Sequence, residues 1–141
     1  MSKSGPIVII EDDEDDKEIF ESIVRELGIQ NEIKWFVETE SAFDFLKTTD
    51  EKVFLIFSDI NLPGKNGIQF KYDIDADPEL RKKSIPFVFL STYASQKDVE
   101  EAYIKVTVQG FFIKGTDYGE IKKMLQHIFE YWKNSKHPNS F

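Results

Sequence analysis

Oxygen-bearing side chains and one amine follow four short apolar runs of this sequence. Glu11 and Asp12 come directly after the first run, Asp59 follows another, Ser91 closes a third and Lys114 a fourth. Two carboxylates about 4 Å apart repel by about 4 kcal/mol at an effective dielectric constant of about 20. A whole domain is stable by only about 5–15 kcal/mol. If the fold brings these acids together, a bound divalent cation is the simplest way to relieve their repulsion.

The chemistry that such a set of side chains supports is phosphoryl transfer. Carboxylate oxygens without a dedicated cage of ligands favour Mg²⁺, which keeps water molecules and shares phosphate oxygens. Lys114 and Ser91 could hold further phosphoryl oxygens, and Asp59 could be a nucleophile that forms an acyl phosphate. Each residue alone has a simpler interpretation: an acid that caps a helix, a solvated lysine or a turn serine. For residues 13–16, helix capping and exposure are the favoured interpretation.

These side chains need a scaffold that brings the ends of the apolar runs to one place. Short runs rich in β-branched and aromatic residues predict strands at residues 7–10, 32–37, 53–58, 86–91 and 110–114. Apolar residues at helical spacing predict helices at residues 14–27, 39–49, 68–83 and 95–106, and from residue 117 onward. Pro78 is expected to end or restart the third of these helices.

Five alternations of strand and helix predict an α/β fold with a parallel sheet covered by helices on both faces. Ligands of such sheets bind beyond the carboxyl ends of the strands, where the side chains above are expected. We interpret residues 1–141 as one domain, with a core at about 6–133 and a polar tail at 134–141 that is expected to fray. His127 and His137 are interpreted as incidental surface residues.

Charge and composition exclude several classes of protein. The net charge is −8 and the single basic cluster, residues 81–84, is interpreted as a solvated helix end, so nucleic acid is not an expected partner. There is no cysteine to form a disulfide or a thiolate site. No apolar run approaches the roughly 20 residues of a membrane span, and the start "MSKSGP" lacks the apolar core of a signal peptide. A cytoplasmic protein is therefore expected.

Four segments together resemble the response-regulator receiver family of two-component signalling. They are "IVIIEDDED", "LIFSDINLPGKNG", "DPELRKKSIPFVFLST" and "GFFIK", and the resemblance extends from about residue 6 to residue 133. It implies a flavodoxin-like (βα)5 fold, a doubly wound five-stranded parallel sheet with strand order 2-1-3-4-5. The resemblance also assigns roles to individual residues.

The resemblance implies that Asp59 is the phosphoryl acceptor and that Mg²⁺ is the cofactor. Asp12 would ligate the metal directly, Glu11 would act largely through water, and Asn61 would supply its backbone carbonyl. Asp13 also follows the first strand, but Glu11 and Asp12 are preferred because they come directly after it.

The resemblance also implies a switch. Ser91 would bond a phosphoryl oxygen, Lys114 would pair with the phosphate, and Phe111 would turn inward when Ser91 moves. Asn61 and Tyr93 occupy positions that tune loss of the phosphoryl group, and we expect the Tyr93 side chain to shield the phosphoaspartate from water.

The expected function is that of a phosphoacceptor signalling protein rather than a turnover enzyme. A histidine kinase or histidine phosphotransfer protein would donate the phosphoryl group, and an output protein that the sequence does not name would read the changed surface. The alternative is a receiver-like interaction module that acts without phosphorylation. Its motivation is Thr92, where the family favours a smaller residue, and Gly115, where the family usually has proline.

A third hypothesis is an enzyme or cofactor binder on the same topology, such as an aspartyl phosphatase or a flavodoxin. The phosphatase would need a second aspartate where Asn61 stands. A flavodoxin would need a loop of hydroxyl residues and glycine after the first strand, where six consecutive acids stand instead.

Overall fold

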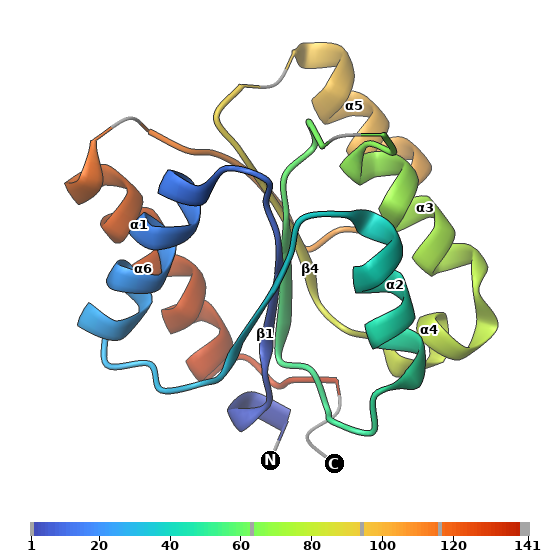
Figure 1. Cartoon of the computed structure of the whole chain (residues 1–141), viewed down its shortest axis with the longest axis horizontal. Helices are drawn as coiled ribbons and strands as arrows, with labels where there is room; N and C mark the ends of the chain where they lie inside the picture. The colour runs from blue at the N-terminus through green and yellow to red at the C-terminus, as the bar shows by residue number, and fades with distance from the viewer. Residues whose placement is uncertain (1, 63, 94, 116, 139–141) are drawn as a thin grey trace.

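Parallel strands form the centre of the computed structural model, which describes residues 2–62, 64–93, 95–115 and 117–138. Within these residues the sheet has five strands in the order β2-β1-β3-β4-β5 (Figure 1). The strands are β1 (Ile7–Ile10), β2 (Ile33–Phe36), β3 (Leu55–Ser58), β4 (Phe87–Ser91) and β5 (Gly110–Ile113). Each lies inside its predicted range, and the strand order is the one that the resemblance implied.

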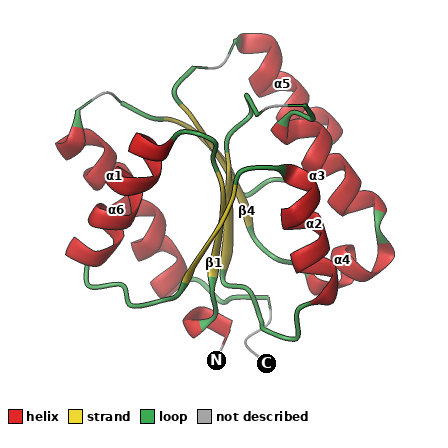
Figure 2. Cartoon of the chain, in the orientation of Figure 1, coloured by secondary structure: helices red, strands yellow, loops and turns green. Residues whose placement is uncertain are grey.

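Helices cover both faces of the sheet, as Figure 2 shows by colour. They are α1 (Glu14–Glu26), α2 (Thr39–Thr48), α3 (Gly67–Ala76), α4 (Pro78–Lys83), α5 (Gln96–Lys105) and α6 (Tyr118–Asn134), after a short 3-10 turn, η1 (Ser2–Ser4). Helices α1 and α6 lie on one face, and α2, α3 and α5 lie on the other (Figure 1). Within the described ranges, no helix is long and apolar enough to cross a membrane.

The strands separate two hydrophobic cores because successive side chains of a strand point to opposite faces. On β1, Val8 and Ile10 belong to the core under α2, α3 and α5. Ile7 and Ile9 belong to the core under α1 and α6. All four are at most 4% exposed, which explains why this strand appears in the sequence as an unbroken β-branched run.

The predicted helix at 68–83 is divided in two, and Pro78 marks the division as expected. Asp77 adopts an extended backbone between α3 and α4, and its carboxylate accepts hydrogen bonds from the N–H groups of Glu79 and Leu80. Pro78 opens α4, where its missing N–H costs nothing.

The C-terminal tail differs from the prediction. His137 is not an incidental surface residue: it is fully buried, and its Nε2 lies 2.7 Å from the carbonyl oxygen of Phe54. Its ring packs against the rings of Phe54 and Trp132, with centroids 5.7 and 5.8 Å away. The expected fraying is therefore wrong for this residue, while residues 139–141 lie outside the described residues. His127 is exposed on α6, as predicted.

Candidate functional site

The register of the sheet brings the predicted side chains to one edge. Ile10 pairs with Ser58, so Glu11 and Asp59 leave neighbouring strands at the same level. The Asp59 N–H extends this pairing by donating to the Ile10 carbonyl at 3.2 Å. On the other side of β3, the Lys114 N–H donates to the Ser91 carbonyl at 2.8 Å. This last bond places Lys114 beside β4, although the next residue is Gly115 and not the proline that is usual in the family.

Three carboxylates gather at the centre of this edge. One oxygen each from Glu11, Asp12 and Asp59 lies within 4.8 Å of the others. Asp59 is 9% exposed, Glu11 is half-buried and Asp12 is exposed. Such a set of hard oxygen ligands, partly open to solvent, fits a divalent cation that keeps some of its water. The structure thus brings together the acids that the sequence predicted for the metal.

Glu11 has an unusual proton affinity for a carboxylate. Burial disfavours its charged form and raises its pKa to about 7, although the Lys114 ammonium and the Asp13 N–H act in the opposite direction. The Asp13 N–H donates to Glu11 Oε1 at 3.0 Å. Proximity to Asp59 and Asp16 raises the pKa further. Burial, and to a smaller extent the neighbouring acids, thus oppose ionisation of Glu11, and a bound cation would favour its charged form.

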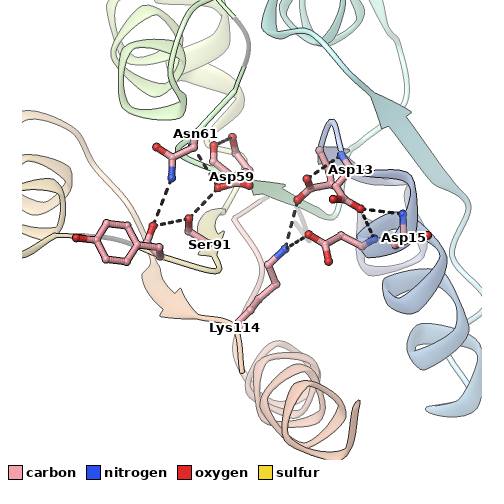
Figure 3. A network of polar contacts seen from close by, with 10 residues as sticks. Asp13, Asp15, Asp59, Asn61, Ser91 and Lys114 are labelled. Carbon is pink, nitrogen blue, oxygen red and sulfur yellow. Dashed lines mark hydrogen bonds and ion pairs between the residues drawn. The ribbon is translucent and has the colours of Figure 1, made fainter. Parts of the chain in front are cut away.

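One carboxylate oxygen of Asp59 accepts two hydrogen bonds. The Ser91 hydroxyl lies 2.8 Å from Asp59 Oδ1, and the Asn61 N–H donates to the same oxygen at 3.2 Å. The Ser91 hydroxyl also lies 2.9 Å from the Tyr93 carbonyl. Because a hydroxyl has one proton, Ser91 donates to only one of these two acceptors at a time. Figure 3 shows Ser91 and Asn61 on the same side of Asp59.

Tyr93 contacts this network through its backbone rather than its ring. Its carbonyl oxygen lies 2.9 Å from the Ser91 hydroxyl and 3.4 Å from the amide nitrogen of Asn61. Its side chain is 70% exposed. The sequence does not reveal this carbonyl contact, and shielding of a phosphoaspartate by the Tyr93 ring stays a prediction.

Lys114 contacts the acids on the α1 side of the site. Its Nζ lies 3.3 Å from Glu11 Oε2 and 3.3 Å from Asp16 Oδ2. Burial alone lowers the pKa of Lys114, but the negative charges of Glu11, Asp16 and Asp59 outweigh burial and raise it above its usual value. In Figure 3 the amine of Lys114 points toward the start of α1. The raised pKa keeps the ammonium in its charged form beside the acidic side chains.

The run of acids divides into residues with different roles. Asp13 caps α1, because its carboxylate accepts from the N–H groups of Asp15 and Asp16, as predicted. Asp16 is not an exposed helix-start residue as predicted: its carboxylate contacts Lys114. Helical spacing could have indicated this contact. Asp16 lies four residues before the buried Phe20, and residues four apart share one face of a helix.

Phe111, the predicted switch aromatic, lies on β5 next to the site. It is half-buried, and its ring centroid is 5.5 Å from that of Phe89 within the core under α2, α3 and α5. Its ring is therefore packed against the core in this structure, in which Ser91 is bonded to Asp59.

The comparison with known proteins identifies the arrangement. The family model of the response regulator receiver domain matches residues 7–126. The chain belongs to the response regulator receiver family. This receiver is 28% identical over 131 residues to response regulator Rcp1 of Synechocystis sp., and the match covers 89% of this chain and 87% of that protein. It is also 28% identical over 130 residues to chemotaxis protein CheY-3 of Vibrio cholerae, covering 92% of this chain and 95% of that protein.

A solved structure agrees with this assignment. The Mn²⁺-bound form of response regulator Rcp1 matches the receiver with a TM-score of 0.81 at 26% identity, covering 94% of this chain and 98% of that one. Receivers are not turnover enzymes, and the match therefore favours a receiver over an aspartyl phosphatase or a flavodoxin. The cluster of Glu11, Asp12 and Asp59 resembles the metal site of a receiver.

Proposed function

We propose that the receiver accepts a phosphoryl group on Asp59 from a phosphohistidine of a histidine kinase or histidine phosphotransfer protein. An Asp59 carboxylate oxygen attacks the phosphorus, the nitrogen–phosphorus bond breaks, and the histidine ring takes the electron pair. The observation that carries this proposal is the surroundings of Asp59. Its Oδ1 accepts a hydrogen bond from the Ser91 hydroxyl at 2.8 Å. One of its carboxylate oxygens also lies within 4.8 Å of an oxygen of Glu11 and an oxygen of Asp12.

The surrounding residues would divide the charge of the transferred group among them. Glu11, Asp12 and Asp59, with the Asn61 backbone carbonyl, would hold Mg²⁺, which neutralises phosphoryl charge. Ser91 would donate its hydroxyl to a phosphoryl oxygen in place of its present bond to Asp59. Lys114 would contribute its ammonium, whose charge is assured by the three carboxylates near it.

The output would be a changed protein-binding surface at β4, β5 and α5. Recruitment of Ser91 to the phosphoryl group would fix the loop after β4 and hold Phe111 inward, shifting a two-state equilibrium. Large apolar side chains are already exposed in this region: Tyr103 is 55% exposed and Ile104 80% exposed on α5, and Ile113 is 50% exposed on β5. A protein partner could bury them.

Intact-protein mass spectrometry tests the proposal. The receiver is incubated with acetyl phosphate and Mg²⁺, without Mg²⁺, and as an Asp59→Asn variant. One added phosphoryl group is expected only for the parent with Mg²⁺. If neither a phosphoryl group nor beryllofluoride, a stable phosphoryl mimic, binds to the parent, the phosphorylation-independent interaction module becomes the better interpretation. In that event Thr92 and Gly115 are the first positions to change to the family's preferred residues.

A further inference from the structure

Lys114 and Asp16 form an ion pair that the proposed phosphoryl transfer does not use. The Asp16 Oδ2 lies 3.3 Å from the ammonium, the same distance as Glu11 Oε2. The Lys114 side chain is 8% exposed and that of Asp16 is 32% exposed. The contact is therefore screened less than a pair on the open surface.

The position of Asp16 is fixed by the fold rather than by the ion pair. Its N–H donates to Asp13 Oδ1 at 3.1 Å in the capped first turn of α1. Its side chain lies beside a cavity of about 20 Å³ that Glu11, Asp59 and Lys114 also line. The backbone of Asp16 is thus fixed at the edge of the site, and its carboxylate reaches the Lys114 ammonium from the first turn of α1.

We infer that Asp16 is a positioning residue that holds the Lys114 ammonium on the α1 side of the site and competes for it with a phosphoryl group on Asp59. This inference rests on the proposed function, because it needs a phosphoryl group at Asp59. A phosphoryl group brings negative charge to the site, and Lys114 can approach it only by loosening its contact with Asp16. The pair therefore favours the unphosphorylated receiver.

The test compares Asp16→Asn with Asp15→Asn. Both variants remove one negative charge from the first turn of α1, but Asp15 is exposed and has no ion pair among the described residues. Beryllofluoride is titrated at saturating Mg²⁺, and bound fluoride is followed by fluorine NMR. Asp16→Asn is expected to bind it about threefold to tenfold more tightly than the parent, and Asp15→Asn within about twofold.

A double variant tests whether the effect passes through Lys114. In a Lys114→Gln background, Asp16→Asn is expected to change beryllofluoride affinity no more than Asp15→Asn does. The metal-free protein gives a second readout. The NMR signal of the Lys114 ammonium should move or broaden in Asp16→Asn and stay in place in Asp15→Asn.

The outcomes separate the inference from the proposed function. If the parent binds beryllofluoride but the two single variants have the same affinity, the inference is wrong and the proposed function stands. An unchanged Lys114 signal in Asp16→Asn also overturns the inference. If the parent does not bind beryllofluoride at all, the proposed function fails and the competition fails with it.

Discussion

The hydroxyl of Ser91 lies 2.8 Å from Oδ1 of Asp59, and both side chains are buried between β3 and β4. The two residues come from neighbouring strands that end at the same edge of the sheet. A second serine contacts the same aspartate differently, because the Ser58 hydroxyl donates to the Asp59 backbone carbonyl at 2.9 Å. The two serines thus offer a matched pair of changes around one residue.

Ser91→Ala is expected to slow phosphoryl uptake from acetyl phosphate by about tenfold or more, because one donor to the transferred group is lost. The loss of a single buried hydrogen bond should lower the free energy of unfolding by only about 0.5–1.5 kcal/mol. Uptake is measured by intact mass against time and stability by urea unfolding.

Ser58→Ala is the control for this experiment. Its hydroxyl is equally buried but bonds the backbone, so a similar loss of stability with nearly unchanged uptake is expected. Equal uptake rates in the two variants would contradict a role for the Ser91 hydroxyl in phosphoryl transfer.

Gly67 is required by the loop that follows Asp59. Its N–H donates to the Ile60 carbonyl at 2.9 Å, and a Cβ at this position would collide with the Asp59 carbonyl oxygen. Gly67→Ala is therefore expected to lower the free energy of unfolding by about 1–3 kcal/mol. This sign opposes the general preference of helices for alanine over glycine. Urea unfolding measures the change, and a Gly67→Ala variant as stable as the parent would refute the close contact.

Mg²⁺ affinity should depend on pH through Glu11. The raised pKa of about 7 means that the metal-free folded protein holds this proton more tightly than the unfolded chain between pH 4.5 and about 7. The contribution of Glu11 protonation to the free energy of unfolding of the metal-free protein is therefore lost as pH rises through that range. Because Mg²⁺ must displace the proton, affinity should fall about tenfold from about pH 8 to about pH 6. Titration calorimetry measures the Mg²⁺ affinity at each pH. The Glu11→Gln variant should bind Mg²⁺ more weakly, and its affinity should not depend on pH in this range. A parent protein whose Mg²⁺ affinity is independent of pH would contradict the prediction.

His137 should make the folded state sensitive to mild acid. Burial lowers its pKa below the usual 6.5, outweighing the bond to the Phe54 carbonyl, so the unfolded chain takes up the proton first. The contribution of neutral His137 to the free energy of unfolding is then fully present above about pH 6.5, and it falls as the pH decreases below that value. In thermal unfolding, His137→Gln should lose part of this decrease while the exposed His127→Gln keeps it. Identical pH profiles for the two variants would show that His137 does not titrate with unfolding.

Much of the site follows from local sequence patterns. Apolar runs located the strands, and parallel strands must end at a common edge, so the amino-acid sequence suffices to place Glu11, Asp59, Ser91 and Lys114 together. The contact of Lys114 with Asp16 is not evident from the run of acids itself, in which every residue after Asp12 has the composition of an exposed helix start. Helical spacing from Phe20 would have separated Asp16 from its neighbours.

Other features could not be predicted because they depend on the path of the chain in three dimensions. The burial of His137 requires the segment after α6 to pass back to Phe54, and no periodic pattern in a short polar tail indicates that path. The contact of Ser91 with the Tyr93 carbonyl is a backbone interaction, which side-chain identity does not encode.

The most direct test of the central claim is to find which residue carries the phosphoryl group. The receiver is treated with acetyl phosphate and Mg²⁺, reduced with borohydride, which converts an acyl phosphate of aspartate to homoserine, and digested for peptide mass spectrometry. The account predicts conversion of Asp59 alone, and no conversion when Mg²⁺ is left out. Conversion at Asp12 or at any other carboxylate, or none in a protein whose intact mass shows the added group, would contradict it.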